Sequence, residues 1–173
     1  QYESIGDVDQ QQIVVTLNSN AFKGMSLNAN YRFGYLKSNV DGFGSFPSYS
    51  YDLGADYSAA SNDIRHSLSF NGSYELPFRF RISPSFSYNS GRPFNITTGA
   101  DTNRDSIFND RPTYAQLGAI CAARALPAGF CSFQSPDQPD QAIIPRNFGR
   151  TPSNVTLDLR LNKSFVFTKE KSR

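Results

Sequence analysis

The chain is poor in the residues on which most catalytic and metal sites depend. Its 173 residues include no tryptophan, one histidine, one methionine and two cysteines, and only 18% of them are charged. No Ser–His–Asp set, nucleophile elbow, phosphate loop or pair of carboxylates in a pocket can be assembled, so we expect no enzyme activity. The net charge is only +2 and the basic residues are scattered, so nucleic acid is not expected as a partner.

Long apolar segments are also missing. No run of about 18 apolar residues occurs, which excludes a transmembrane helix but not a membrane strand, since a strand needs only about 9 to 11 residues. With 38% hydrophobic residues and a mean hydropathy of -0.47, a soluble core would be thin for this length. The chain opens on Gln1 without an initiator methionine or a signal peptide, so we interpret it as a fragment of a secreted protein.

Aromatic residues are abundant instead. The chain contains 15 Phe and 9 Tyr, which make up 14% of its residues. Disordered chains are usually poor in aromatic residues and rich in charge, so disorder fits this composition badly. Many Tyr, Phe and uncharged polar residues together with few charges are typical of strands with one lipid face and one watery face.

Apolar and polar residues alternate with a period of two, which also indicates β-strands. From Met25 to Lys37 the odd positions are mostly apolar and the even positions mostly polar. The same pattern recurs four times, which predicts strands near residues 11–19, 25–37, 64–75, 80–89 and 154–165. Charges such as Asp158 and Arg160 fall on the polar faces, and the exceptions, Lys37 and Lys163, stand at strand ends, where a long side chain can reach water.

The connections between these strands alternate in length. Residues 20–24 and 75–79 form tight turns, whereas 39–63 and 90–153 are long loops rich in Gly, Pro, Ser, Asn and Asp. Short periplasmic turns and long extracellular loops are typical of bacterial outer-membrane barrels. We therefore expect an all-β fold, an antiparallel transmembrane β-barrel segment of about five strands across 1–173, with Thr168–Arg173 as the next turn. An odd number of strands cannot close such a barrel, so the remaining strands of the parent barrel and outer-membrane lipid are expected partners.

The second long loop carries a group of possible cation ligands. Asp101, Asn103 and Asp105 stand two residues apart, and Asn109 and Asp110 follow. Alternating oxygen donors of this kind are typical of calcium loops, although the glycine and glutamate of an EF-hand are replaced by Ser106 and Pro112. The alternative is a polar loop whose Asp and Asn side chains bind their own backbone or pair with nearby arginines.

Other features of the loops and strands leave two interpretations open. Cys121 and Cys131 form either a loop disulfide of an oxidising compartment or two unpaired thiols. A short helix at 119–125 is possible. The loop aromatics either contact a ligand or pack on one another, and the strand-end aromatics form an interfacial girdle, pack across strands, or do both. The loop set is Phe43, Phe46, Tyr49, Tyr51 and Tyr57, and the strand-end set is Tyr31, Tyr35, Tyr74, Phe80 and Tyr88.

A series of short motifs resembles one known family. Four motifs follow one another along the chain: Ser90-Gly91-Arg92-Pro93-Phe94, Thr97-Thr98-Gly99, Asn109-Asp110-Arg111-Pro112 and Pro145-Arg146-Asn147. The stretches His66–Leu76 before them and Asn154–Lys163 after them also look like the strands of that family. This order over about residues 60–167 resembles the C-terminal barrel half of TonB-dependent outer-membrane receptors, in particular the Oar-like group that contains a carboxypeptidase regulatory domain. Residues 1–59 resemble it only through their strand pattern.

The resemblance implies a function for the parent protein. Such receptors have a barrel of about 22 strands plugged by an N-terminal domain, and they take up, export or display a ligand with energy from the inner-membrane TonB complex. The plug, the energy-coupling box and the terminal aromatic strand are missing from this sequence, so transport is expected only from the whole parent. The alternative is a soluble β-sandwich that serves as a calcium-dependent binding or adhesion module. The strands of such a fold average about 5 or 6 residues, and the predicted strand Met25–Lys37 is longer than that.

Overall fold

The computed structural model describes residues 6–20, 23–42, 44–126 and 142–165. The chain divides into two compact units, each of which includes some residues outside the described ranges. The unit that we call the strand unit comprises Gln12–Gly34, Ile64–Gly91 and Pro152–Arg173, and the loop unit comprises Gln1–Gln11, Tyr35–Asp63 and Arg92–Thr151. The loop unit is therefore assembled from the N-terminal segment and the two long connections.

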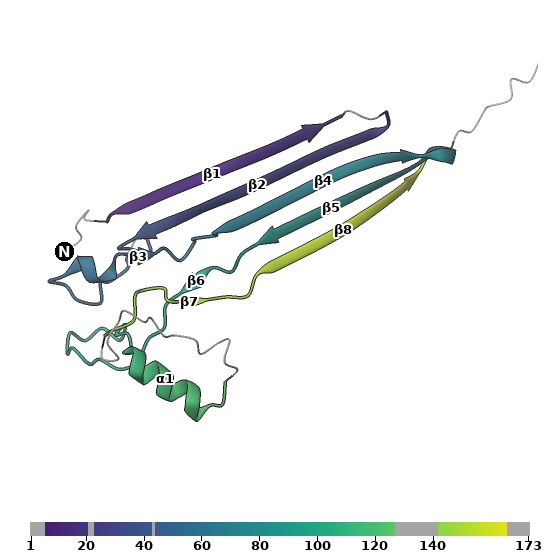
Figure 1. Cartoon of the computed structure of the whole chain (residues 1–173). Coiled ribbons are helices and arrows are strands. Elements are labelled where there is room, and N and C mark those ends of the chain that lie inside the picture. Colours follow the sequence, from purple (N-terminus) through teal and green to yellow (C-terminus); the bar gives the residue numbers. More distant parts are fainter. Residues whose placement is uncertain (1–5, 21–22, 43, 127–141, 166–173) are drawn as a thin grey trace, which may run out of the picture. The chain divides into compact units, whose positions relative to one another are not determined.

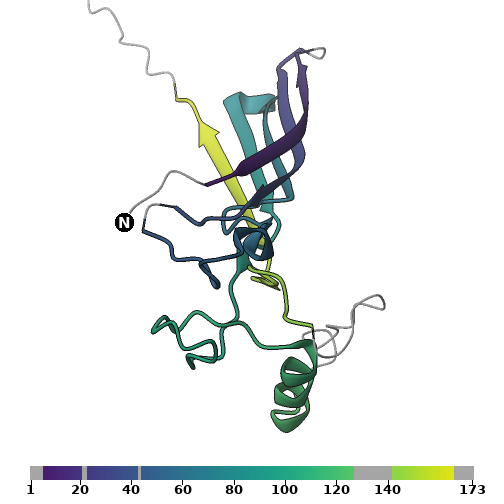
Figure 2. The same ribbon diagram turned by 90° about the vertical axis from the view of Figure 1, so that its left-hand side faces the viewer.

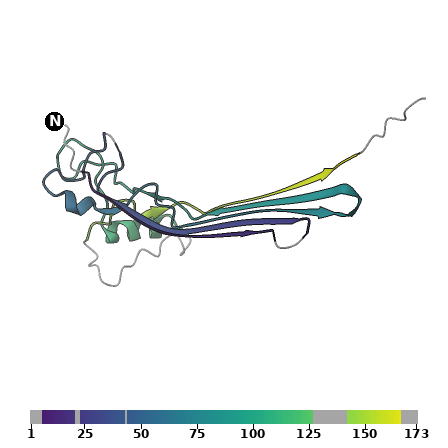
Figure 3. The same cartoon turned by 90° about the horizontal axis from the view of Figure 1, so that it is seen from above.

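An antiparallel sheet is the main element of the fold (Figure 1). Its long strands are β1 (Val8–Ser19), β2 (Met25–Ser38), β4 (His66–Leu76), β5 (Phe80–Asn89) and β8 (Asn154–Lys163), and they lie in the order β1-β2-β4-β5-β8. Figure 3 shows them running alongside one another, and Figure 2 shows the twist between β1 and β8. The sheet is open, because β1 and β8 each have one neighbour among the described residues. The predicted all-β antiparallel fold is confirmed.

The register pairs apolar residues with apolar ones and polar residues with polar ones across the sheet. Between β2 and β4, Tyr31 faces Leu68 and Asn30 faces Ser69. Between β5 and β8, Phe86 faces Leu157 and Ser85 faces Asp158. Because side chains alternate between the two faces of a strand, this register builds one continuous apolar face and one continuous polar face.

Pro84 is unusual inside a strand, because a proline has no N–H group to donate to the hydrogen-bond ladder. It lies inside β5 and pairs with Leu159 of β8. On the other side, the register between β4 and β5 passes from Asn71 opposite Ser85 to Tyr74 opposite Ile82. A Cβ atom at Gly72 would lie 3.7 Å from Cγ of Pro84, which is an ordinary contact distance, so the proline ring lies beside Gly72 where the ladder is locally interrupted.

Three predicted strand bounds differ from the observed ones by two or three residues, and the ends of β2 and β4 differ by one. β1 begins at Val8 rather than residue 11, and the Asn39 amide, just beyond β2, donates to the Asp7 carbonyl at 3.2 Å, so the chain there already lies beside β2. β4 begins at His66 rather than 64, since Asp63 still closes a turn by donating to the Ala60 carbonyl at 3.0 Å. β8 ends at Lys163 rather than 165, because its partner there, Phe80, is the first residue of β5.

Both long connections contain regular elements of their own. The first holds the 3-10 helix η1 (Leu53–Asp56) and β3 (Ser58–Ala59), which pairs with β2. The second holds β6 (Pro93–Phe94), the helix α1 (Tyr114–Ala123) and β7 (Gly149–Arg150), and β6 pairs with β7. The expected helix at 119–125 thus begins five residues earlier, because Thr113 and Gln116 form a capping box that starts the helix at Tyr114.

The tight turn between β4 and β5 is the 3-10 element η2 (Pro77–Arg79), as its proline predicts. Phe78 and Arg79 both adopt positive φ angles, of 62° and 63°. The predicted turn at residues 168–173 lies outside the described residues. Of the helices in the described part of the chain, none is long and apolar enough to cross a membrane.

Buried side chains gather in the loop unit, and many of them are polar. The buried hydrophobic residues are Ala60, Leu117, Cys121 and Ile144, and the buried polar or charged residues are Ser38, Asp56, Asp63, Asp110, Arg146 and Asn147. All belong to the loop unit. The apolar side chains of the sheet stay exposed instead, with Leu157 at 71% and Ile13 at 65%. A soluble β-sandwich would bury that face, so this alternative is not favoured.

Candidate functional site

The polar face of the sheet is lined by hydrogen bonds between side chains of neighbouring strands. The hydroxyls of Ser26 and Ser73 lie 2.8 Å apart, and the Ser85 hydroxyl donates to the Asn71 amide oxygen at 2.8 Å. Near the turn, Arg81 forms an ion pair with Glu75. In a barrel wall, polar and charged side chains of this kind belong on the water-filled side, where they remain solvated.

Aromatic residues occur near both ends of the apolar face. Towards the end where the long loops leave the sheet, the Tyr31 hydroxyl lies 2.9 Å from Nδ1 of His66, and the Phe33 ring lies 5.1 Å from the His66 ring. At the turn end, the Lys163 ammonium lies 4.7 Å from the centroid of the Phe80 ring. Aromatic rings and snorkelling lysines at two levels are what a barrel presents to the two membrane interfaces.

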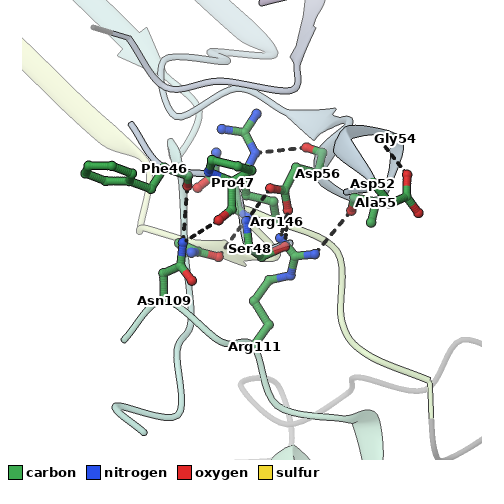
Figure 4. Close-up of polar contacts among 12 residues, drawn as sticks. Phe46, Pro47, Ser48, Asp52, Gly54, Ala55, Asp56, Asn109, Arg111 and Arg146 are labelled. Carbon is green, nitrogen blue, oxygen red and sulfur yellow. Dashed lines mark hydrogen bonds and ion pairs between the residues drawn. The ribbon is translucent and has the colours of Figure 1, made fainter. Parts of the chain in front are cut away.

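A buried ion pair joins the two long connections in the loop unit (Figure 4). Asp56, at the end of η1, pairs with Arg111, and their side chains are only 2% and 5% exposed. The second guanidinium nitrogen of Arg111 donates to the Ala55 carbonyl at 3.1 Å. Asp56 also accepts the Ser48 amide at 2.7 Å and the Ser48 hydroxyl at 2.6 Å. This carboxylate is therefore held by three donors, two from Ser48 and one from Arg111, rather than by charge alone.

Two further arginines connect the same loops. Arg146 pairs with Asp41 at 2.7 Å and donates through Nε to the Asp56 carbonyl at 2.9 Å. Arg150 pairs with the buried Asp63 at 2.9 Å, and Asp63 also accepts the Leu36 amide at 3.0 Å. The first loop thus supplies the carboxylates and the second loop the guanidinium groups. Nε of Arg111 is buried without a hydrogen-bond partner among the described residues, but each buried carboxylate of this network is paired, and the pairs tie the loops into one defined conformation.

These contacts lower the pKa values of two carboxyl groups, those of Asp56 and Asp110. Burial by itself raises the pKa of Asp56, but the hydrogen bonds from Ser48 and the Arg111 guanidinium outweigh it, so the pKa lies below its ordinary value. Burial likewise opposes the shift at Asp110, yet the donors from Thr102 and Asn103 lower the pKa of this carboxyl. Both groups remain charged across the neutral range. In contrast, the hydrogen bond to Asp9 raises the pKa of Tyr57 to about 12.

The five residues predicted as calcium ligands lie in one loop, where their side chains bind backbone and neighbouring groups. Asp101 accepts the amides of Asp105 and Ser106 at 3.1 and 3.0 Å, and Asp105 accepts the Ile107 amide at 2.8 Å. Asp110 accepts the Thr102 amide at 2.5 Å. The Asn103 side chain donates to the Ser48 carbonyl, and the Asn109 side chain to those of Phe46 and Pro47.

This geometry is that of turns stabilised by Asp and Asn side chains. Within the described part of the chain, no group of three or more His, Cys, Asp or Glu residues is arranged to hold a metal ion. Asn109 Oδ1 is nevertheless buried without a hydrogen-bond partner among the described residues. The calcium site therefore stays a prediction.

Only one of the two cysteines, Cys121, lies among the described residues. Cys121 lies in α1 and is 7% exposed. Cys131 lies outside the described residues, as does Phe43 of the loop aromatics. The loop disulfide accordingly stays a prediction. The remaining loop aromatics are exposed, with Phe46 at 66% and Tyr51 at 90%.

A cavity of about 590 Å³ opens within the loop unit. Ligand sites in proteins commonly have volumes of about 300 to 1,000 Å³. Its described lining combines three tyrosines, small polar side chains, an Ile-Ile-Pro segment and the pair Asp110 and Arg111: Ser48, Tyr49, Ala55, Tyr57, Thr102, Asn103, Asp110, Arg111, Tyr114, Ile143, Ile144 and Pro145. Two members, Tyr49 and Tyr57, belong to the aromatic set that the sequence marks as possible ligand contacts.

Sequence reasoning missed the anchors of this site. It did not select Asp56 or Asp63, because nothing in the local sequence separates a buried aspartate from an exposed one such as Asp52. Their partners Arg111 and Arg150 stand 55 and 87 residues away, so only the folded loops bring them together. Arg111 and Arg146 were visible, but only as members of short motifs. Polar residues held by distant partners leave no periodic pattern in a sequence.

Comparisons with known proteins agree with the sheet and its two faces. No curated protein matches the chain, and no solved structure matches it. The family model described as "Outer membrane beta barrel domain" matches residues 1–173, which is the whole chain. Together with the sorted faces of the sheet, this match places the protein in the bacterial outer membrane. The chain belongs to the outer membrane β-barrel domain family.

Proposed function

We propose that the chain is part of the barrel of a TonB-dependent outer-membrane receptor that takes up or displays a ligand. The observation that carries this proposal is the loop unit, in which buried Asp–Arg pairs hold two long loops around a cavity. A loop that served only to connect two strands would not need this network. Loops held in one conformation on a strand scaffold are the usual place for ligand contacts in such folds.

The family match supports the barrel, and the motifs support the narrower assignment. Ser90–Phe94 and Asn109–Pro112 follow the order of the TonB-dependent group, and Arg92, Pro93 and Arg111 from these motifs have structural roles. Pro93 starts β6, while Arg111 holds the buried carboxylate of Asp56. The Arg92 amide donates to the Thr151 hydroxyl at 2.9 Å, which closes the base of the second loop.

The polar face of the sheet would line the lumen, and the apolar face would contact lipid. The proposed partners are outer-membrane lipid, the remaining strands of the barrel, the inner-membrane TonB complex and a ligand of the loops. The TonB complex would act through N-terminal parts that this sequence does not include. The proposed role is binding and transport rather than catalysis.

Paired gene deletions in the source bacterium test this proposal. One strain lacks the gene for this protein, and a second lacks TonB. Both are compared with the parent strain for growth when iron, cobalamin or a saccharide is limiting. We expect the two strains to lose growth on the same nutrient. A copy of the gene should restore growth in the first strain but not in a third strain that lacks both genes, and restoration in that third strain would contradict the proposal.

A further inference from the structure

We infer that the cavity of the loop unit is a binding site for a neutral oligosaccharide. This inference rests on the proposed function and names the class of ligand that the loops would present. Three tyrosines from separate segments line the cavity: Tyr49, Tyr57 and Tyr114. Tyr49 and Tyr57 precede and follow η1, and Tyr114 opens α1. Flat rings of this kind pack on the apolar C–H faces of sugar rings, while their hydroxyl ends remain available to polar groups.

The two charged groups in the cavity walls are buried and already bonded, which disfavours a charged ligand. Asp110 and Arg111 are the only charged residues in the described lining. Arg111 already pairs with Asp56 and donates to the Ala55 carbonyl. Asp110 accepts two donors from Thr102 and one from Asn103. A ligand carboxylate would therefore lose its hydration here without gaining an unpaired counter-charge, and an ammonium would reach only the Asp110 carboxylate, which is 6% exposed and already accepts three hydrogen bonds.

Uncharged hydrogen-bonding groups remain in the walls. Among the residues that the structure describes, the hydroxyls of Tyr49 and Tyr114 have no side-chain hydrogen bond, whereas that of Tyr57 donates to Asp9. The Thr102 hydroxyl donates its hydrogen to Asp110 at 2.7 Å and keeps lone pairs that can accept. Sugar hydroxyls both donate and accept, so they match this set, and the Ile143–Pro145 segment adds an apolar wall.

Titration of the whole chain with defined probes tests the inference. The chain is refolded in the zwitterionic detergent lauryldimethylamine oxide, because a maltoside detergent would itself present a sugar. The probes are cellotriose and maltotriose as neutral saccharides, trigalacturonate as an anion, a chitosan trimer as a cation and a capped neutral tripeptide. Saturation-transfer difference NMR measures binding. We expect a neutral trisaccharide to bind at least about tenfold more tightly than the charged trimers or the tripeptide.

Aromatic residues of the first long loop provide matched variants. Tyr49→Ala removes a cavity ring and should weaken binding of the neutral trisaccharide about tenfold, whereas Tyr49→Phe should keep most of it. Phe46→Ala removes a ring that is 66% exposed and outside the cavity, and it should change the affinity less than about twofold. An unchanged affinity in Tyr49→Ala, or tighter binding of a charged trimer or of the tripeptide, would overturn the inference.

This test is separable from that of the proposed function. Refolding and titration in detergent need no TonB complex, so they report on the cavity alone. If no saccharide binds while the two deletion strains lose growth on the same nutrient, the oligosaccharide site is contradicted and the proposed receptor function is supported. If saccharide binds while gene restoration proves independent of TonB, the site stands and the transport mechanism falls.

Discussion

Asp56 is the residue whose environment says most about how the loops are held. Its carboxylate is buried, accepts both polar hydrogens of Ser48 and pairs with an equally buried arginine. A buried pair adds little net stability over a hydrophobic pair of the same shape, but removal of one partner leaves an uncompensated charge. The main effect of Asp56 is therefore to specify one loop conformation.

Substitution of this aspartate should release the loops. Asp56→Asn is expected to destabilise the loop unit by about 3 to 5 kcal/mol, because Arg111 stays buried without a counter-charge. Asp52→Asn is the matched control, since Asp52 is exposed, caps η1 through the Gly54 amide, and asparagine caps equally well. Limited proteolysis of the refolded chain measures the difference. Equal cleavage rates in the loops of the two variants would contradict this role.

The loop unit should also respond to acid. Asp56 and Asp110 have folded-state pKa values below their ordinary value of 3.8, so their contribution to stability is present above that value. It is lost as the pH falls from about 4 towards their folded-state values. Amide hydrogen exchange of residues 44–63 and 100–112 should show protection that is constant from pH 7 to 5 and falls below pH 4. Loss of protection near pH 6 would show that other groups control the loops.

At the scale of elements, the short hairpin β6–β7 depends on a glycine. A Cβ atom at Gly149 would lie 2.5 Å from the nearest atom of the Phe94 ring, which is closer than atoms can approach. Gly149→Ala should therefore displace the ring and destabilise the loop unit by about 1 to 3 kcal/mol. Gly118→Ala, in α1 with open space around it, should stabilise by up to about 1 kcal/mol. Urea titration compares the two variants, and equal shifts would contradict the packing.

Strand β8 offers a test of which face meets lipid. Leu157 is on the apolar face opposite Phe86, and Thr156 is on the polar face opposite Ser87. Near the bilayer midplane, Leu157→Arg should cost about 2 to 4 kcal/mol, whereas Thr156→Arg should cost close to nothing. Refolding into lipid vesicles at increasing urea concentration measures both. A larger loss in Thr156→Arg would reverse the assignment of the faces.

At the scale of the whole molecule, an exposed apolar face requires an apolar solvent. The chain should gain strand signal by circular dichroism and a heat-modifiable band on gels only when detergent is present. Parallel samples with and without calcium examine Asp101, Asn103 and Asp105, and a calcium-dependent gain in strand signal or loop protection would establish the predicted site. A cooperatively folded monomer in plain buffer would contradict the membrane assignment despite the family match.

The sequence by itself determined the strands, their faces and their connections. A strand presents alternate side chains to opposite sides, so lipid on one side and water on the other leave a period of two that can be read directly. Turn and loop lengths then indicate which ends lie together. The predicted bounds were wrong only at some strand ends and at α1. The capping box of Thr113 and Gln116 sets the start of α1, and the last paired residue of the neighbouring strand sets the end of β8.

Only the tertiary structure decided how the long loops are built. Asp56 with Arg111, and Asp63 with Arg150, are paired across 55 and 87 residues of sequence. The cavity beside them is lined by segments from both loops. Local propensity and periodicity act over a few residues, whereas these contacts depend on how two irregular segments fold against each other, so no pattern in the sequence encodes them visibly.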